Sequence, residues 1–547
     1  MGWSLALALL VLGPGLGDGF LLVRDMVWVP DLALRSDVLG LGSGLPRAVP
    51  SDAVVAVLDE VVPGLLLQKL VLVGALAAGG VGATRLLPAE ATLVPRLAAV
   101  SLYGWNALVA ERLLMGAWPL LVGYAVLPWL LAAARRWRED GRLPAALLVL
   151  LPLGSLSASA GLAGAVALLA GAAGRGRTAR AVLLVAVANA PWWVAGLLHA
   201  GSATSDAAAA GVFALRGEGS VPAPLAALTL GGIWNTQVHP GSRTGALGWV
   251  ALLALVGLAA LGVRAWWRGT AARDRTTLLV CWAVGWALGV LTWLVPGAFG
   301  WAADHVPGAG VVRDGARALV LCAPLLVVLV AHGVRVLVDA VAVAPARAVL
   351  GVGAVLLPVA LLPDLGWGAR QRLEPATYPA AYAEARDALA GTRGDVLVLP
   401  LSSYRAPAYN HGGLVLDPLG RVLRRDYVAS DVLVVDGVAL AGEDPRVTAA
   451  ARALEAPTPE RRAAGLAALG IGAVATDRTA PAGADQPDVA GERLVDDPTL
   501  QVTGLADVRE RHVPAGWRAA MALAWAAFVG GPLAAVSTAV RRRRTRR

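Results

Sequence analysis

The chain has 547 residues, of which 57% are hydrophobic and 16% are charged, and its mean hydropathy is +0.64. Soluble domains carry about 25% charged residues, so a soluble chain of this length would lack the charges that its surfaces need. The composition therefore excludes an ordinary soluble protein and indicates that lipid is the main solvent. Of the 47 basic residues only Lys69 is a lysine, which excludes a Walker-type phosphate loop. We interpret the net charge of +9 as a topology signal, with no nucleic-acid partner.

Twelve apolar segments approach the roughly 20 residues that a membrane-spanning helix needs. In chain order these segments are 3–22, 63–84, 92–110, 113–134, 143–155, 158–174, 179–199, 245–264, 276–296, 317–338, 346–364 and 517–539. The stretch 143–174 leaves two interpretations open, a pair of short spans or one kinked span. Arginines flank it on both sides, and the positive-inside rule favours the pair, because one crossing would place an arginine cluster outside. No basic region or cleavage site accompanies the first segment, so we expect it to be retained as a helix.

The other arginines assign the two faces of the membrane. They fall on a single face together with the basic tail 541–547, which predicts that both termini are cytoplasmic. The opposite, outer face of the plasma membrane receives most of the acidic residues and the longest polar segments. These segments are 18–62, 200–244, 297–316 and 366–514. We therefore expect any chemistry on the outer face.

The segment 366–514 has the pattern of a separate domain. A helical pattern at 379–390 ends at Gly391 and precedes an apolar strand at 396–399, and the same order recurs at 459–475. A helix followed by a buried strand, twice, predicts a small α/β domain outside the membrane, inserted before the last helix. The predicted fold is thus an all-α polytopic membrane protein with an extracytoplasmic α/β domain. Its expected divisions are 1–365, 366–514 and 515–547.

Two carboxylates in the first outer loop, 18–62, are candidates for catalysis. Asp25 and Asp31 follow the first apolar segment, and Trp28 between them is a residue type that anchors membrane interfaces. A carboxylate at this depth can accept a proton from a hydroxyl group, or bind a divalent cation that carries a phosphate. The alternative is a solvated acid that caps a turn. The residues do not establish whether a metal ion is used.

A second candidate group lies between the third and fourth apolar segments, where we expect a short turn near 108–116. Glu111 and Arg112 are charged residues at or inside the outer interface, where charges usually face protein, water or substrate. Arg112 can clamp a phosphate, and Glu111 can pair with it or act on a hydroxyl group. Asn106 of the same segment is a further substrate-binding candidate. A purely structural ion pair is the competing interpretation.

Two further outer segments carry candidates for substrate binding. Arg313 and Arg317 begin an apolar segment from the outside, which opposes both the positive-inside bias and the helix dipole and indicates an anionic ligand. Asp314 between them is a further substrate-binding candidate, and the alternative is that it neutralises their charges. In the loop 200–244, His239 and Arg243 accompany an aromatic residue and amides, a mixture that suits a sugar and equally an ordinary interfacial loop.

With these residues in view, the chain resembles the large actinobacterial membrane proteins related to GT-C glycosyltransferases, in the manner of the cell-wall arabinofuranosyltransferases. The resemblance rests on the acidic loop 24–31, the segment 103–113, the residues 313–315 and the late α/β domain. It implies a polyprenyl-phosphate sugar donor that enters from the membrane and an acceptor glycan of the cell envelope outside. It also implies that an acidic residue of the first outer loop acts as base or metal ligand, here Asp25 and, as second choice, Asp31.

The leading hypothesis is accordingly a glycosyltransferase at the outer face of the plasma membrane. In it Asp25 deprotonates the acceptor hydroxyl, Arg112 and Arg313 or Arg317 hold the lipid phosphate, and the 366–514 domain holds the glycan. The alternative is a non-enzymatic protein, either a transporter of lipid-linked glycan or a scaffold for envelope polysaccharide assembly. Few charged residues lie deep in the apolar segments, which weakens a proton-coupled transporter but not a scaffold.

Overall fold

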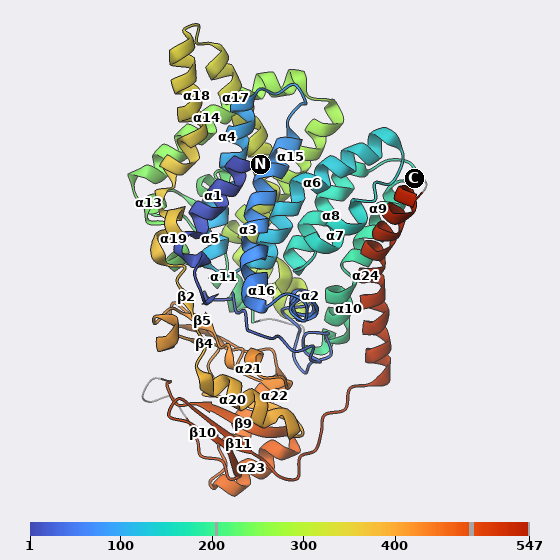
Figure 1. Ribbon diagram of the computed structural model, residues 1–547, viewed down its shortest axis with the longest axis vertical. Helices are drawn as coiled ribbons and strands as arrows, with labels where there is room; N and C mark the ends of the chain where they lie inside the picture. Colours follow the sequence, from blue (N-terminus) through green and yellow to red (C-terminus); the bar gives the residue numbers. More distant parts are fainter. Residues whose placement is uncertain (203–205, 481–485, 545–547) are drawn as a thin grey trace.

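The computed structural model describes residues 1–202, 206–480 and 486–544, and it has a large helical bundle with a small β domain at one end (Figure 1). The bundle helices are α1 (Gly2–Leu12), α3 (Gly64–Ala83), α4 (Leu93–Gly104), α5 (Ala107–Leu114), α6 (Trp118–Asp140), α7 (Leu147–Gly154), α8 (Ala158–Ala172), α9 (Thr178–Ala188), α10 (Ala190–Leu198), α14 (Ala246–Gly269), α15 (Ala272–Leu294), α17 (Ala323–Asp339), α18 (Ala344–Leu361) and α24 (Ala515–Arg544). Shorter elements connect them. These are α2 (Ser51–Leu58), α11 (Ala208–Val212), α12 (Ala223–Leu228), α13 (Gly241–Thr244), α16 (Pro296–His305), α19 (Gly366–Gln371) and the 3₁₀ turns η1 (Gly13–Leu16), η2 (Thr84–Leu86), η3 (Ala200–Ser202), η4 (Thr236–Val238), η5 (Ala309–Val312), η6 (Gly315–Leu321) and η7 (Pro363–Leu365).

Seven helices in the described part of the chain are long and apolar enough to cross a membrane. They are α3 with η2, α4 with α5, α6, α14, α15, α18 and α24. Two bent pairs, α9 with α10 and η6 with α17, raise the number to nine if each pair is one span. Helices form within all twelve predicted ranges, but α1, α7 and α8 are each shorter than 18 residues. A multi-pass helical protein is thus confirmed, whereas the number of twelve spans stays a prediction.

Helix pairs in the bundle approach closely where glycines face each other's backbones. A Cβ atom at Gly262 of α14 would lie 2.0 Å from the carbonyl oxygen of Leu329 on α17, and one at Gly333 would lie 1.9 Å from that of Leu258. Larger side chains would force these two helices apart. Small residues at helix crossings are typical of membrane proteins, because lipid supplies no hydrophobic force that drives helices together.

The turn after the third apolar segment lies later in the chain than the sequence predicts. Residues 107–114 form the helix α5, and the turn to α6 falls at 115–117 instead of 108–116. Asn106 begins α5, because its side-chain oxygen accepts a hydrogen bond from the N–H of Val109. The placement puts Glu111 and Arg112 inside the bundle, each with 2% of its surface exposed.

The β domain contains a five-stranded sheet in the order β10-β11-β9-β3-β6. Its strands are β3 (Asp395–Leu399), β6 (Tyr427–Val428), β9 (Ile471–Asp477), β10 (Glu492–Asp496) and β11 (Leu500–Gly504). The strand β3 is parallel to both β6 and β9, and the other pairs are antiparallel. The predicted order of helix and strand is present twice, as α20 (Ala380–Ala388) before β3 and α23 (Pro459–Ala468) before β9.

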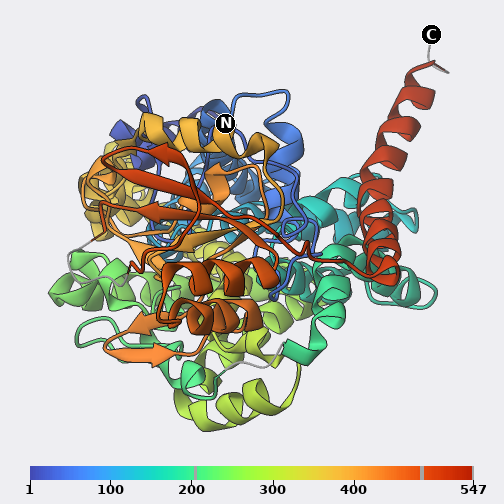
Figure 2. The ribbon, with the colours of Figure 1, turned by 90° about the horizontal axis from the view of Figure 1, so that it is seen from below.

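The side chains of β3 alternate between two apolar layers, as expected for a strand that is covered on both faces. Leu397 and Leu399 pack in a cluster with residues of α22 (Pro445–Leu454) and α23, whereas Val396 and Val398 belong to a cluster with α20 and α21 (Leu419–Val422). The second cluster is continuous with the apolar core of the bundle. Figure 2 shows the sheet from below with helices lying across it.

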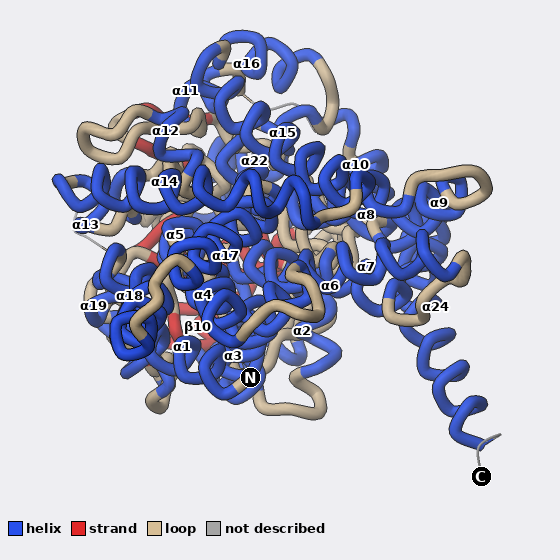
Figure 3. The backbone as a smooth tube through the Cα atoms, turned by 90° about the horizontal axis from the view of Figure 1, so that it is seen from above, coloured by secondary structure: helices blue, strands red, loops and turns tan. Residues whose placement is uncertain are grey.

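The first outer loop joins the bundle to the β domain. Its strand β1 (Phe20–Leu21) pairs with β2 (Pro375–Ala376), and Arg24 bridges to the strand β5 (Val415–Leu416), which pairs in turn with β4 (Tyr404–Arg405). A further hairpin, β7 (Leu433–Val435) with β8 (Val438–Leu440), lies in the same domain. From the opposite end the bundle helices lie in front of the strands (Figure 3), and the N-terminus and the C-terminal end of α24 lie on the side of the bundle away from the domain (Figure 1).

Candidate active site

Asp25 lies where the first outer loop, the turn after α5 and the β domain meet. The backbone N–H of Asp25 donates to the carbonyl oxygen of Met115, 3.2 Å away, and Met26 closes a tight turn on Val23. Gly116 allows this approach, because a Cβ atom there would lie 2.2 Å from the nitrogen of Met26 and its φ is +78°. The carboxylate of Asp25 is half-buried at this junction.

The β domain supplies the partner of this carboxylate. The hydroxyl of Tyr404, in the segment after the carboxyl end of β3, donates a hydrogen bond to Oδ1 of Asp25. Burial, together with the charge of Asp25, raises the pKa of Tyr404 well above its ordinary value, so the phenol is a neutral donor at physiological pH. Segments after strand carboxyl ends commonly form binding sites, and this one faces the bundle.

Asp31 does not join Asp25. Its carboxylate pairs with Arg424 and, at 3.8 Å, with Arg386, both in the β domain. About 29% of its side chain is exposed. The structure therefore gives Asp31 a surface ion pair between the first outer loop and the domain, which favours a docking role over catalysis.

Glu111 is buried in a polar cluster of its own. Its carboxylate accepts hydrogen bonds from the N–H groups of Gly232 and Ile233, at 3.2 and 3.3 Å, and interacts electrostatically with Glu218. Glu218 is fully buried and is held by the guanidinium of Arg243, which also donates to Thr229 at 2.8 Å.

His239 is close to the same cluster, since its Nε2 lies 2.8 Å from the carbonyl oxygen of Ile233. The structure thus brings together Glu111, His239 and Arg243, three of the residues that the sequence singled out. Their hydrogen-bonding groups are directed at backbone, Glu218 and Thr229, which favours the interpretation as an ordinary interfacial loop over that of a sugar site.

Arg112 forms a buried ion pair. Its two terminal nitrogens lie 3.2 and 3.4 Å from the oxygens of Asp314. Arg317 holds the same carboxylate through Nε at 2.9 Å. Burial alone would raise the pKa of Asp314, but the two guanidiniums lower it below its ordinary value. This arrangement favours the structural alternative for Arg112 and Arg317, because the carboxylate already occupies the place of an anionic ligand.

Arg313 points to the β domain instead. Its Nη1 lies 3.4 Å from an oxygen of Glu443, and its guanidinium lies over the ring of Phe213, 4.8 Å from the centroid. Arg47 of the first outer loop reaches the same glutamate at 3.3 Å. Arg313 thus lies at a boundary between the bundle and the β domain, and its charged partner there is the carboxylate of Glu443.

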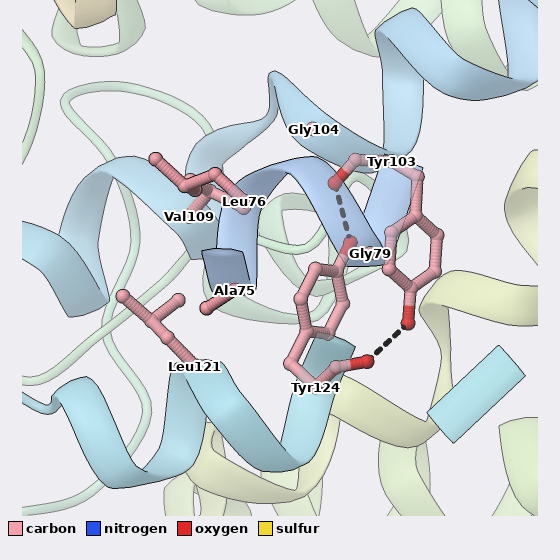
Figure 4. Close-up of a pocket in the computed structure, with 8 residues that line it drawn as sticks. All are labelled: Ala75, Leu76, Gly79, Tyr103, Gly104, Val109, Leu121 and Tyr124. Carbon is pink, nitrogen blue, oxygen red and sulfur yellow. Dashed lines mark hydrogen bonds between the residues drawn. The ribbon is translucent and has the colours of Figure 1, made fainter. Parts of the chain in front are cut away.

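The side chain of Asn106 makes its hydrogen bonds at the break between α4 and α5. Its side-chain nitrogen donates to the carbonyl oxygens of Leu102 and Tyr103 and to the hydroxyl of Tyr124. The rings of Tyr103 and Tyr124 stack at 4.2 Å, and each hydroxyl donates to the carbonyl oxygen of the other residue (Figure 4). The cavity beside them has a volume of about 10 Å³, no more than one water molecule needs. These contacts give Asn106 a structural role.

An open cleft of about 260 Å³ lies at the same junction and was not predicted. It is lined by the first outer loop at 22–24, by Leu114, and by the segments 371–374 and 410–414. Arg24 was recognisable in the sequence as an arginine on the outer face, but its partner Arg372 is 348 positions later and carries no local signal. Among the residues that the structure describes, no three His, Cys, Asp or Glu side chains are grouped so that they could hold a metal ion.

Comparisons with known proteins support the fold. No family model matches the chain, and no curated protein matches it. Two solved structures do: the cryo-EM structure of arabinofuranosyltransferase AftD from Mycobacteria, with 18% identity and a TM-score of 0.57, and that of a mutant of the same enzyme, with 16% and 0.56. The chain shares the fold of AftD. Each match covers 93% of this chain but only 39% and 41% of the AftD chains. The resemblance that the sequence predicted is thus confirmed at the level of the fold.

Proposed function

We propose that this protein is a membrane glycosyltransferase that moves a sugar from a polyprenyl-phosphate donor onto a cell-envelope glycan at the outer face of the plasma membrane. The observation that carries the proposal is the position of Asp25. Its half-buried carboxylate lies at the junction of the helical bundle and the β domain, in a chain whose fold is that of an arabinofuranosyltransferase. The catalytic acid that the sequence predicts lies in the same loop.

In the proposed reaction Asp25 accepts the proton of an acceptor hydroxyl. The hydroxyl oxygen forms a bond to the anomeric carbon of the donor sugar, the bond from that carbon to the phosphate oxygen breaks, and polyprenyl phosphate leaves with the electron pair. Tyr404 remains neutral, so it donates a hydrogen bond to the carboxylate and does not compete for the proton. An acceptor hydroxyl that approaches Asp25 takes the place of this donor or shares the carboxylate with it.

The arrangement of the chain supports reaction on the outer side. The N-terminus and the C-terminal end of α24 lie on the side of the bundle away from the β domain (Figure 1), and α24 ends in a run of arginines. Under the positive-inside rule that side is cytoplasmic, which places Asp25 and the β domain outside. The acceptor glycan then reaches Asp25 from the aqueous side, along the edge of the sheet that carries Tyr404.

The donor is proposed to reach the junction from the membrane. Two of the arginines that the sequence suggested for its phosphate, Arg112 and Arg317, are held by Asp314. Arg243, suggested for a sugar, is held by Glu218. Arg313, the remaining candidate, lies at the boundary with the β domain, where it pairs with Glu443. The phosphate is therefore expected at the junction instead of in the bundle interior.

Two substitutions in the first outer loop test the assignment. Asp25→Asn removes the base without changing the size of the side chain, and Asp31→Asn is the matched control, because Asp31 makes only ion pairs with the β domain. Purified full-length protein in lipid nanodiscs is given a polyprenyl-phosphate-linked arabinofuranose and a glycan acceptor. We expect Asp25→Asn to lose at least 100-fold in transfer rate and Asp31→Asn to stay near the unsubstituted rate. Equal rates for Asp25→Asn and the unsubstituted protein would refute the role of Asp25 and favour the scaffold alternative.

A further inference from the structure

The open cleft of about 260 Å³ beside Asp25 has two arginines on its wall. Arg24 comes from the first outer loop and Arg372 from the segment that enters the β domain, so the cleft exists only because these two parts of the chain meet. Arg24 precedes Asp25 in sequence and has a left-handed φ of +47°. Both Asp25 and Tyr404 are close enough to act electrostatically on Arg24, which places the cleft next to the proposed reaction centre.

The two guanidiniums are neighbours that lack a carboxylate partner. Arg24 Nη2 donates to the side-chain oxygen of Gln237 at 2.9 Å, and Arg372 Nη2 donates to the backbone oxygen of the same residue at 2.7 Å. In the described part of the chain, no carboxylate oxygen lies within 4.0 Å of either guanidinium. Burial and the like charge of Arg24 lower the pKa of Arg372. A neutral amide thus holds two cations that an anion would bind more strongly.

The backbone before Arg372 is built into an unusual conformation. Residues 367–371 all have left-handed φ values, between +49° and +68°, although only one of them is a glycine. Such a conformation costs about 1–2 kcal/mol per residue outside glycine. Gly13 makes room for it, because a Cβ atom there would lie 2.9 Å from the Cα of Trp367. Strained segments of this kind concentrate at binding and active sites.

Besides the arginines, the wall of the cleft has the polar residues Glu374, Asn410 and His411 and an apolar part that suits a partly apolar ligand. Leu22 and Leu114 form part of its wall, and Leu414 is 40% exposed at its side. Trp367 precedes Arg372 by five residues and is 59% exposed, as expected for a tryptophan at the boundary between hydrocarbon and headgroups. The charged part of the cleft is thus near the level at which the phosphate of a membrane lipid lies.

We propose that this cleft binds a phosphate group through Arg24 and Arg372. The chemistry is that of a phosphate ester, which two adjacent guanidiniums can hold with several parallel N–H···O bonds. The apolar wall and the position of Trp367 favour an isoprenoid lipid as the carrier of the phosphate. Its identity as the sugar donor rests on the proposed function, whereas the binding of phosphate does not.

The test is binding of farnesyl phosphate to the full chain in detergent, measured by the change in tryptophan fluorescence. Farnesol lacks the phosphate, and inorganic phosphate lacks the lipid. We expect Arg372→Gln and Arg24→Gln each to weaken the binding of farnesyl phosphate by about tenfold or more. Arg370→Gln is the matched control, because Arg370 is exposed, pairs with Asp364 at 2.7 Å and does not line the cleft.

The outcomes separate the cleft from the reaction. Unchanged affinity in Arg372→Gln, a residue exposed enough to be replaced without unfolding the chain, overturns the site, as does equally tight binding of farnesol. Inorganic phosphate that competes as well as farnesyl phosphate supports the site and assigns it to free phosphate. Asp25→Asn tests the proposed function separately. It is expected to bind farnesyl phosphate at least as tightly as the unsubstituted protein, because it removes a negative charge near Arg24, and to lose at least 100-fold in sugar transfer. Sugar transfer at the unsubstituted rate would refute the base while leaving the cleft intact.

Discussion

The buried pair of Arg112 and Asp314 offers a direct test of whether an arginine inside the bundle holds the structure or a ligand. Both side chains are almost inaccessible, with 2% and 5% exposed, and Arg317 on the rim is 45% exposed. Replacing Arg112 by methionine leaves a buried carboxylate with Arg317 as its single cation. Breaking one side of a buried pair costs about 3–5 kcal/mol, and the remaining contact with Arg317 places the expected loss at about 3 kcal/mol.

The matched variant removes both charges. In the double substitution Arg112→Met with Asp314→Leu no buried charge is left, and Arg317 reaches water, so most of the lost stability returns and the net change is about 1 kcal/mol. Unfolding in mixed micelles with increasing SDS, followed by tryptophan fluorescence, measures both values. The double variant is also expected to bind farnesyl phosphate normally. A folded double variant with at least tenfold weaker binding would refute the structural assignment and return Arg112 to the phosphate site.

Two further predictions concern the junction. Gly116→Ala is expected to reduce sugar transfer and to destabilise the chain by about 2–3 kcal/mol, because the methyl group collides with the turn that carries Asp25; Gly141→Ala, at a similar φ but in open space, is the control and costs about 1 kcal/mol. The second concerns pH. Burial and the charge of Asp37 raise the pKa of Asp426, so above pH 4 the folded chain holds more protons there than the unfolded chain, and the contribution to stability falls as pH rises through the folded pKa. Asp426→Asn should therefore lose less stability between pH 4.5 and 7 than the unsubstituted protein, as judged by thermal unfolding at both values; an equal or steeper loss would contradict this account.

The features that the sequence predicted correctly are those that one local pattern determines. A run of apolar residues is sufficient for a helix in lipid, because every backbone group must be satisfied within the segment, and helices form in all of the predicted ranges. The strand at 396–399 and the helix before it follow from alternation and from a glycine at the helix end. Asp25 lies near the start of the first outer loop, and its catalytic role stays a prediction.

Pairings between distant residues were not predictable in this way. Asp25 and Tyr404 are separated by 379 positions, and Arg112 and Asp314 by 202. The placement of an arginine on the outer side shows that it needs an anion, but whether that anion is a ligand or a carboxylate depends on which segments pack together. The position of the turn at 115–117 was missed for a related reason. Charged residues at 111 and 112 indicated a loop, whereas their partners in the fold allow them to lie inside a helix.

The partner that each arginine has in the fold distinguishes arginines with a structural role from arginines that can bind a ligand. An arginine in the bundle interior must keep its carboxylate at all times, since a buried charge without a partner costs several kcal/mol; Arg112 and Arg243 meet this condition. An arginine that binds and releases a phosphate must instead be held by something weaker than a carboxylate when the ligand is away. Gln237 provides such a partner for Arg24 and Arg372, because an amide oxygen accepts a hydrogen bond without neutralising the charge. The candidate for phosphate binding therefore moves from the arginines that oppose the positive-inside rule most strongly to the two at the junction that no carboxylate contacts directly.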